Sequence, residues 1–79
     1  MKIYVEYFAK FKEKSGCNKE IIVTKALTLN DLFKELDKKY NFQMNQDLIK
    51  VALNEEFSDW SSTIKDDDTV VFIQPVAGG

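Results

Sequence analysis

The chain of 79 residues contains no histidine and no arginine, so its 11 basic residues are all lysines. Without histidine, no side chain is ready to exchange a proton near neutral pH. Without arginine, the chain lacks the planar guanidinium that holds a phosphate or carboxylate through two hydrogen bonds. These absences argue against a catalyst that works alone. They favour a substrate, a carrier or a binding module.

Cysteine and glycine are also scarce. Cys17 is the only cysteine, so it has no partner for an internal disulfide, a zinc site or a Cys–His nucleophilic pair. Gly16 is the only glycine before the last two residues, which excludes a glycine-rich phosphate loop. We therefore expect the chain itself to bind no metal and no cofactor. A lone cysteine also suggests a reducing, cytoplasmic location.

Long apolar runs and a strong net charge are missing as well. No stretch approaches the 18 apolar residues that suggest a membrane span, and the first residues already show a strand pattern where a signal peptide would stand. A net charge of -2 and a pI near 5.0 give no reason to expect nucleic acid or an anionic membrane as partner. The 44% of hydrophobic residues is enough for the core of one small domain.

Alternating apolar residues predict several short strands. We expect them at residues 2–8, 20–24, 48–53 and 69–74, with a further short strand near Phe57. Phe42 and Met44 are expected to pack beneath a loop, and Trp60 to anchor another loop to the core. The run 66–68 of three aspartates predicts a turn. It is not expected to bind a cation, because it lacks the spaced oxygen ligands of a calcium loop.

Two helical segments are predicted between these strands. Residues 9–14 favour one or two turns, which Gly16 can end in the left-handed conformation. Residues 29–40 form the clearest helix, with Thr28 as its N-cap and apolar residues repeating on one stripe. On the solvated side of this helix, Glu35 and Lys39 are spaced to form an ion pair.

The predicted order of elements is β-β-α-β-β-β, in one domain that spans residues 1–74. A helix that crosses one face of a mixed sheet after a first hairpin is the ubiquitin-like β-grasp arrangement, an α+β fold. The right-handed crossover rule places the first and last strands side by side and parallel at the centre of the sheet.

A single helix covers only one face of such a sheet. Strand parity directs Tyr4, Phe8, Val71 and Ile73 toward the other face, where an exposed antiparallel sheet usually carries polar residues. Contiguous exposed apolar area often marks a partner site. We therefore expect a protein to dock there, unless loops of the same chain cover this face.

Residues 75–79 are predicted to form a flexible tail. Pro75 has no backbone N–H and stops the last strand, and Val76 and Ala77 lead into Gly78 and Gly79. Five extended residues reach about 17 Å, and two glycines let a narrow active site close around the terminal carboxylate. A frayed terminus is the plain alternative.

Over nearly its whole length the sequence resembles the small subunit of molybdopterin synthase (the MoaD family), a ubiquitin-like sulfur carrier. The resemblance is carried by six segments, namely Phe8-Ala9, Phe11-Lys12-Glu13 with Gly16, the helix from Thr28, Val51-Ala52-Leu53-Asn54, the acidic turn with Asp66 and Asp68, and Phe72-Ile73-Gln74-Pro75-Val76-Ala77-Gly78-Gly79. Two positions depart from the family, which often has paired prolines at Gln74-Pro75 and usually a glycine at Asp67. Asp67 must then adopt a left-handed conformation, which aspartate tolerates better than most residues.

The resemblance implies a specific chemistry. An E1-like adenylyltransferase, using ATP and Mg²⁺, activates the carboxylate of Gly79, and a sulfur donor converts it to a thiocarboxylate. The tail then enters the large subunit of a heterotetrameric molybdopterin synthase and gives its sulfur to cyclic pyranopterin monophosphate. In this scheme the chain is a sulfur-donor subunit with no catalytic side chains of its own.

The resemblance also implies site residues. Gly78 and Gly79 are the reactive end, and the large subunit contacts Phe8, Phe57 and Ile73 as well as the segment Pro75-Val76-Ala77. Three alternatives stay open. One is a shorter-bodied sulfur carrier for thiazole (thiamine) biosynthesis, another is a ubiquitin-like modifier that is joined to lysines, and the third is an interaction domain whose Gly-Gly is inert.

Overall fold

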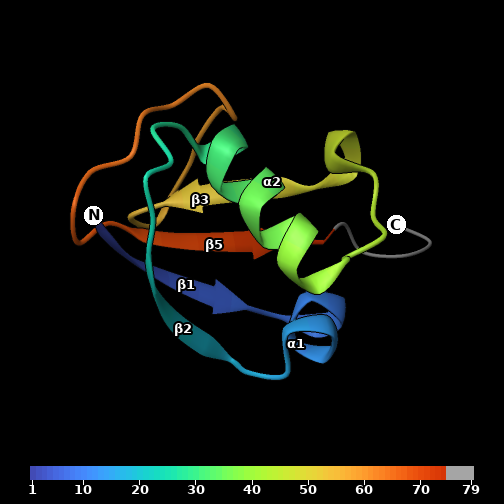
Figure 1. The fold of residues 1–79 in the computed structure, drawn as a ribbon. Helices are drawn as coiled ribbons and strands as arrows, with labels where there is room; N and C mark the ends of the chain where they lie inside the picture. The colour runs from blue at the N-terminus through green and yellow to red at the C-terminus, as the bar shows by residue number, and fades with distance from the viewer. Residues whose placement is uncertain (75–79) are drawn as a thin grey trace.

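The structure is a computed structural model that describes residues 1–74. In chain order, the elements are β1 (Lys2–Tyr7), α1 (Ala9–Ser15), β2 (Lys19–Val23), α2 (Leu29–Tyr40), the 3₁₀ helix η1 (Gln46–Leu48), β3 (Lys50–Leu53), β4 (Glu56–Phe57) and β5 (Thr69–Ile73) (Figure 1).

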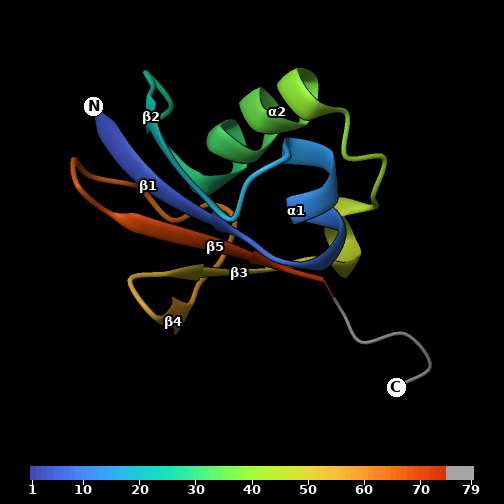
Figure 2. The same cartoon turned by 90° about the horizontal axis from the view of Figure 1, so that it is seen from below.

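The strands form one mixed sheet in the order β2-β1-β5-β3-β4. β1 and β5 are parallel neighbours, and every other pair in the sheet is antiparallel. Both helices lie on the same side of the sheet, and α2 crosses that face diagonally (Figures 1 and 2). The predicted ubiquitin-like β-grasp fold is therefore confirmed, including the parallel contact of the first and last strands.

The face of the sheet beneath α2 carries the core. Ile3, Val5 and Tyr7 of β1 and Val70 and Phe72 of β5 are all at most 1% exposed. α2 buries the apolar stripe that its sequence predicts, because Leu29, Leu32, Phe33 and Leu36 all face this side of the sheet. One buried face and one helix stripe thus hold the domain together.

Aromatic rings fill the end of the core nearest α1. Phe42 packs edge-to-face on Phe11 at a centroid distance of 5.0 Å, and Phe33 lies 5.5 Å from Phe72. Trp60 packs 5.1 Å from Phe33, which confirms that it anchors its loop to the core. Large aromatic side chains suit a short chain, because each buries much apolar area for little lost side-chain entropy.

The predicted caps and turns are present. The Thr28 hydroxyl accepts a hydrogen bond from the backbone N–H of Asp31 at 3.2 Å, which caps α2. Gly16 ends α1 with φ of 80°, in the left-handed region. Asp67 has φ of 71° in the turn before β5, as expected, and Asp66 there accepts a hydrogen bond from the Lys2 N–H.

Several details of the sequence-based prediction were wrong. β1 ends at Tyr7 and not at residue 8, β2 spans Lys19–Val23 and not residues 20–24, α1 ends at Ser15 and not at residue 14, and β5 ends at Ile73 and not at residue 74. β3 begins at Lys50 and not at residue 48, because the Asn45 side chain accepts the Asp47 N–H at 3.0 Å and favours the 3₁₀ turn of η1. The ion pair expected within α2 does not form, because both of its members have partners on β2 or just after it. Lys39 lies 3.4 Å from Glu20, and Glu35 accepts a hydrogen bond from Thr24 at 2.6 Å.

Glu20 is the hub of a polar network between β2 and α2. Its carboxylate accepts hydrogen bonds from the hydroxyls of Tyr7 at 2.7 Å and Tyr40 at 2.6 Å, besides the contact with Lys39. Burial alone would raise the pKa of Glu20, but these hydroxyls and the lysine charge outweigh it and hold the pKa below its usual value. For Tyr7, burial and the hydrogen bond to Glu20 both raise the pKa.

The network predicts a pH-dependent contribution to stability. Because folding lowers the pKa of Glu20, its ionised form stabilises the fold above about pH 4.3, the unfolded value, and that contribution is lost as the pH falls through the folded pKa. Glu20→Gln should lower the free energy of unfolding at pH 7 by about 1–3 kcal/mol, measured by urea titration of Trp60 fluorescence.

The same titration at about pH 3 should show a smaller difference between Glu20→Gln and the parent chain. Below the unfolded pKa the unfolded chain binds a proton at Glu20, so the stabilisation by the ionised form falls as the pH falls. Glu13→Gln on the exposed side of α1 is the control and should match the parent chain at both pH values. An equal loss at both pH values would show that the charge of Glu20 contributes nothing.

Candidate partner surface at the end of the central strand

The face of the sheet opposite α2 has no covering helix (Figure 2). Alternate residues of all five strands point toward it, and the strand registers set them in rows. Its members are Lys19, Ile21, Val23, Lys2, Tyr4, Glu6, Thr69, Val71, Ile73, Lys50, Ala52 and Phe57. We call this set the open face. Many of its residues are apolar, although an uncovered sheet face usually carries polar residues.

Two of the predicted contact residues meet where β5 ends. Tyr7 pairs with Phe72 in the parallel ladder, so the next residues, Phe8 and Ile73, lie side by side. Phe8 is extended, with φ of -127°, and 55% exposed because it stands between β1 and α1. Ile73 is half-buried. Parity had placed both residues on the uncovered side, and the structure brings them together.

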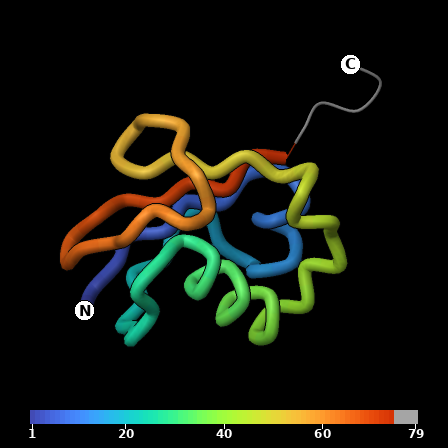
Figure 3. The backbone as a smooth tube through the Cα atoms, turned by 90° about the horizontal axis from the view of Figure 1, so that it is seen from above, coloured from blue at the N-terminus to red at the C-terminus, as the bar shows by residue number. Residues whose placement is uncertain are grey.

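Phe57 reaches the open face from the other edge of the sheet. It pairs with Ala52, which in turn pairs with Val71 of β5. A two-residue turn joins β3 and β4, and both of its residues, Asn54 and Glu55, have positive φ. This hairpin bends to the side away from α2 (Figures 2 and 3), and Phe57 is left 73% exposed.

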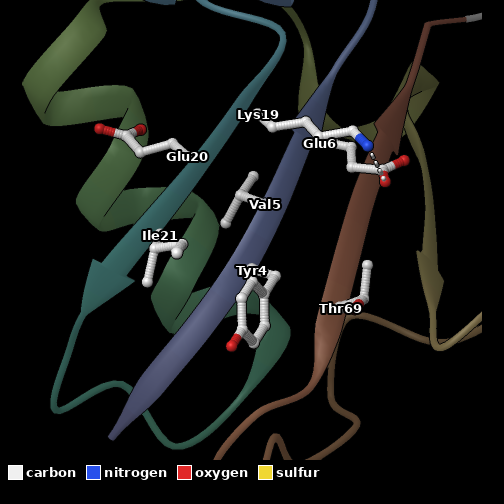
Figure 4. Close-up of a pocket in the computed structure, with 7 residues that line it drawn as sticks. All are labelled: Tyr4, Val5, Glu6, Lys19, Glu20, Ile21 and Thr69. Atoms are coloured by element: carbon white, nitrogen blue, oxygen red, sulfur yellow. Dashed lines mark ion pairs between the residues drawn. The ribbon is translucent and has the colours of Figure 1, made fainter.

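The open face extends to β2, which the sequence analysis did not include. Tyr4, Ile21 and Thr69 line a shallow hollow there, and an ion pair of 3.8 Å between Lys19 and Glu6 lies beside it (Figure 4). Ile21 is 62% exposed. The orientation of Ile21 is not evident from the sequence, because residues 21–23 are all β-branched and show no alternation. The feature that could have predicted it is Glu20, which hydrogen-bonds to tyrosines on the covered side, so that the odd-numbered residues of β2 face the other way.

The electrostatics of the open face are simple. The charged side chains in its rows are Lys2, Lys19, Lys50 and Glu6. The Glu20 network lies on the covered side of β2 (Figure 4). Within residues 1–74 no group of three or more histidine, cysteine or acidic residues is arranged to hold a metal ion. No helix in this range is long and apolar enough to cross a membrane.

The predicted reactive end lies outside the described residues. This applies to Pro75, Val76, Ala77, Gly78 and Gly79 alike, so their assigned roles stay predictions. What the structure does place is Gln74, half-buried directly after β5. Because β5 is hydrogen-bonded to β1 on one side and to β3 on the other, the point at which the chain enters the predicted tail is held firmly.

Comparison with known proteins shows the family to which the chain belongs. The family model described as "ThiS family" matches residues 5–79. A molybdopterin converting factor subunit 1 from Pyrococcus furiosus has 28% identity and a TM-score of 0.81, over 96% of this chain and 99% of that one.

Two further structures are similar. In a complex of subunits 1 and 2 of molybdopterin-converting factor from Helicobacter pylori, the matched chain is 29% identical, with a TM-score of 0.70 and full coverage of both chains. SAMP1, a small archaeal modifier protein from Haloferax volcanii, has 20% identity and a TM-score of 0.81, again with full coverage of both chains. At that identity, the likeness to SAMP1 shows the shared fold alone.

Substitutions of aromatic residues on the open face and in the core should differ clearly in their effect on stability. Phe57→Ser should change the free energy of unfolding by no more than about 0.5 kcal/mol, because the ring is mostly in water already. Phe72→Ala, which removes a ring with 0% exposure, should cost about 3–5 kcal/mol. Urea titrations of both variants measure this, and a large loss for Phe57→Ser would place Phe57 in the core.

Proposed function

We propose, on the premise that this chain belongs to the ThiS family, that it is the sulfur-carrying small subunit of a molybdopterin synthase. As a member of this family it is a ubiquitin-like sulfur carrier of the ThiS/MoaD type. The observation that carries the finer assignment is the apolar open face, which adjoins the end of β5. A carrier that must seat on a second subunit while its tail enters an active site needs a docking surface at this place.

The proposed activation begins at the carboxylate of Gly79. This carboxylate, anionic at neutral pH, attacks the α-phosphorus of ATP in an E1-like adenylyltransferase and releases pyrophosphate. The product is an acyl-adenylate, whose AMP is a far better leaving group than oxide. A sulfur nucleophile displaces AMP and leaves a thiocarboxylate at Gly79. ATP and Mg²⁺ belong to the activating enzyme, and this chain provides the carboxylate.

The proposed transfer takes place in the large subunit. The thiocarboxylate sulfur attacks a carbon of cyclic pyranopterin monophosphate, and a C–O bond at that carbon breaks, so that the oxygen leaves as water or with the opened phosphate ester. Hydrolysis of the resulting thioester leaves the sulfur on the pterin and restores the Gly79 carboxylate. A dithiolene contains two sulfur atoms, so two loaded carriers are consumed for each product. The side chains of the carrier take no part in these steps, in keeping with the lack of histidine and arginine.

The body of the carrier has the task of presenting the tail. Ile73 and Phe57 on the open face, and Phe8 beside it, offer exposed or half-exposed apolar area that a large subunit can bury. The complex of subunits 1 and 2 from Helicobacter pylori supports a partner protein of this kind. Gly78 and Gly79, which lack Cβ atoms, would let the narrow part of the partner's active site close around the main chain.

Intact-mass spectrometry tests sulfur carriage directly. After incubation with the adenylyltransferase, ATP and a sulfide source, the chain should gain the mass of one oxygen replaced by sulfur, at Gly79. Deletion of Gly79 should abolish the gain and leave the free energy of unfolding unchanged, because the tail is predicted to lie outside the domain of residues 1–74. No gain, with an enzyme proven active on another carrier, would contradict the proposal.

The acceptor then separates the related functions. The loaded chain should convert cyclic pyranopterin monophosphate to the dithiolene product when the large subunit is added. Sulfur delivered only to a thiazole synthase would instead assign the chain to thiamine biosynthesis. Isopeptide conjugates to lysines in place of sulfur transfer would assign it to the modifiers.

Binding to the large subunit tests the open face. Ile73→Lys should weaken the complex by about 3 kcal/mol, because it places an unpaired charge in a desolvated apolar contact. Leu27→Lys also replaces an exposed apolar residue by lysine, but Leu27 lies between β2 and α2, outside the open face. It is the matched control and should bind nearly as the parent chain. Isothermal titration calorimetry measures both, and normal binding by Ile73→Lys would show that this surface is not the docking site.

A further inference from the structure

The end of β5 has an exposed apolar residue on each side within the sheet. On the β1 side stands Phe8. On the β3 side, Lys50 pairs with Ile73, so the residues just before Lys50 flank the end of β5. They belong to η1, whose last residue is Leu48 (Figure 1). Phe8 and Leu48 therefore lie on opposite sides of the strand from which the predicted tail departs.

Leu48 is held in an outward position by its neighbours. Its N–H donates to the Asn45 carbonyl at 3.0 Å, and the next residue, Ile49, is only 4% exposed and anchors the turn in the core. Gln46 donates a side-chain hydrogen bond of 2.8 Å to Asn30 at the start of α2. Leu48 itself is 62% exposed. The exposed side chain of Leu48 adds little to the stability of the fold, because an apolar side chain stabilises a protein by being buried.

A hollow lies beside Leu48, and it adjoins the start of the predicted tail. Its lining comprises Met44, Asn45, Leu48, Ile49 and Gln74. Gln74 is the residue that follows β5, so whatever fills the hollow also touches the chain where it enters residues 75–79. Met44 is half-buried against the core, and its flexible thioether can adjust to an inserted side chain.

We propose that η1 is a second docking contact for the large subunit, which inserts an apolar side chain into the hollow between Met44, Leu48 and Gln74. The inference rests on the proposed function, because it takes the large subunit as the protein that receives the tail. Its basis is continuity: the open face ends at Ile73, and the hollow begins at the next residue, Gln74. A contact beside Gln74, added to those on the open face, would help to set the direction in which the tail enters the active site.

Leu27 provides a matched comparison within the chain. It is also an exposed leucine, at 67%, but it lies between β2 and α2. β2 is antiparallel to β1 and β1 is parallel to β5, so the end of β2 is at the opposite end of the sheet from the end of β5. A role that depends on exposed apolar area in general would affect Leu27 and Leu48 alike, and a role tied to the tail would affect Leu48 alone.

The test is calorimetric titration of the large subunit from the same source with Leu48→Ser, Leu27→Ser and Leu48→Met of the full chain. Leu48→Ser should raise Kd about tenfold, because it removes one buried apolar anchor. Leu27→Ser should stay within about twofold of the parent chain, and Leu48→Met likewise, since methionine keeps the apolar contact. Urea titrations check that all three variants are folded.

Unchanged binding by Leu48→Ser would overturn the inference, as would an equal loss for Leu27→Ser. Adenylation by the activating enzyme is measured in parallel. Loss of adenylation with unchanged binding to the large subunit would also overturn it, because the contact would then belong to the other partner. Failure of the proposed function is distinct: the parent chain itself would then not bind the large subunit, whatever the variants do.

Discussion

The parallel pairing of β1 with β5 is the contact on which the rest of this structure depends. It joins the start of the chain to its last strand, across nearly the full length of the sequence, and puts β5 between β1 and β3. Phe72 on β5 is then buried beneath Phe33 and Trp60, while Ile73, the next residue, points to the other face. One strand thus completes the core and also forms the centre of the candidate docking surface.

This arrangement separates stability from chemistry. The core and the Glu20 network lie on the α2 side of the sheet, and the apolar residues around the end of β5 lie on the open face or beside it. Substitutions at Phe8, Ile73 or Leu48 thus leave most of the buried contacts in place. A sulfur carrier benefits from this division, because its exposed surface can suit a partner protein without cost to the fold.

The polar network shows how so small a domain fixes an edge strand. β2 is at the edge of the sheet and has only one strand partner. Glu20 ties it to Tyr7 of β1 and to Tyr40 at the end of α2 through charged hydrogen bonds, which are stronger than neutral ones. These bonds hold the helix over the sheet at the end where the aromatic rings of Phe11 and Phe42 pack.

Periodicity predicted the strands, the helix and the parity that directs Tyr4 and Ile73 away from the core, because these depend on local backbone repeats. The Thr28 cap fixed the start of α2, and the crossover rule gave the β-grasp arrangement. Contacts between distant segments decided the rest. Lys39 pairs with Glu20 and not with Glu35, because folding brings β2 beside α2. Leu48 flanks the end of β5 only through the register of β3 with β5, and Ile21 joins the open face only through that of β2 with β1. Such pairings between strands far apart in sequence are set by tertiary packing, which no local pattern of residues encodes.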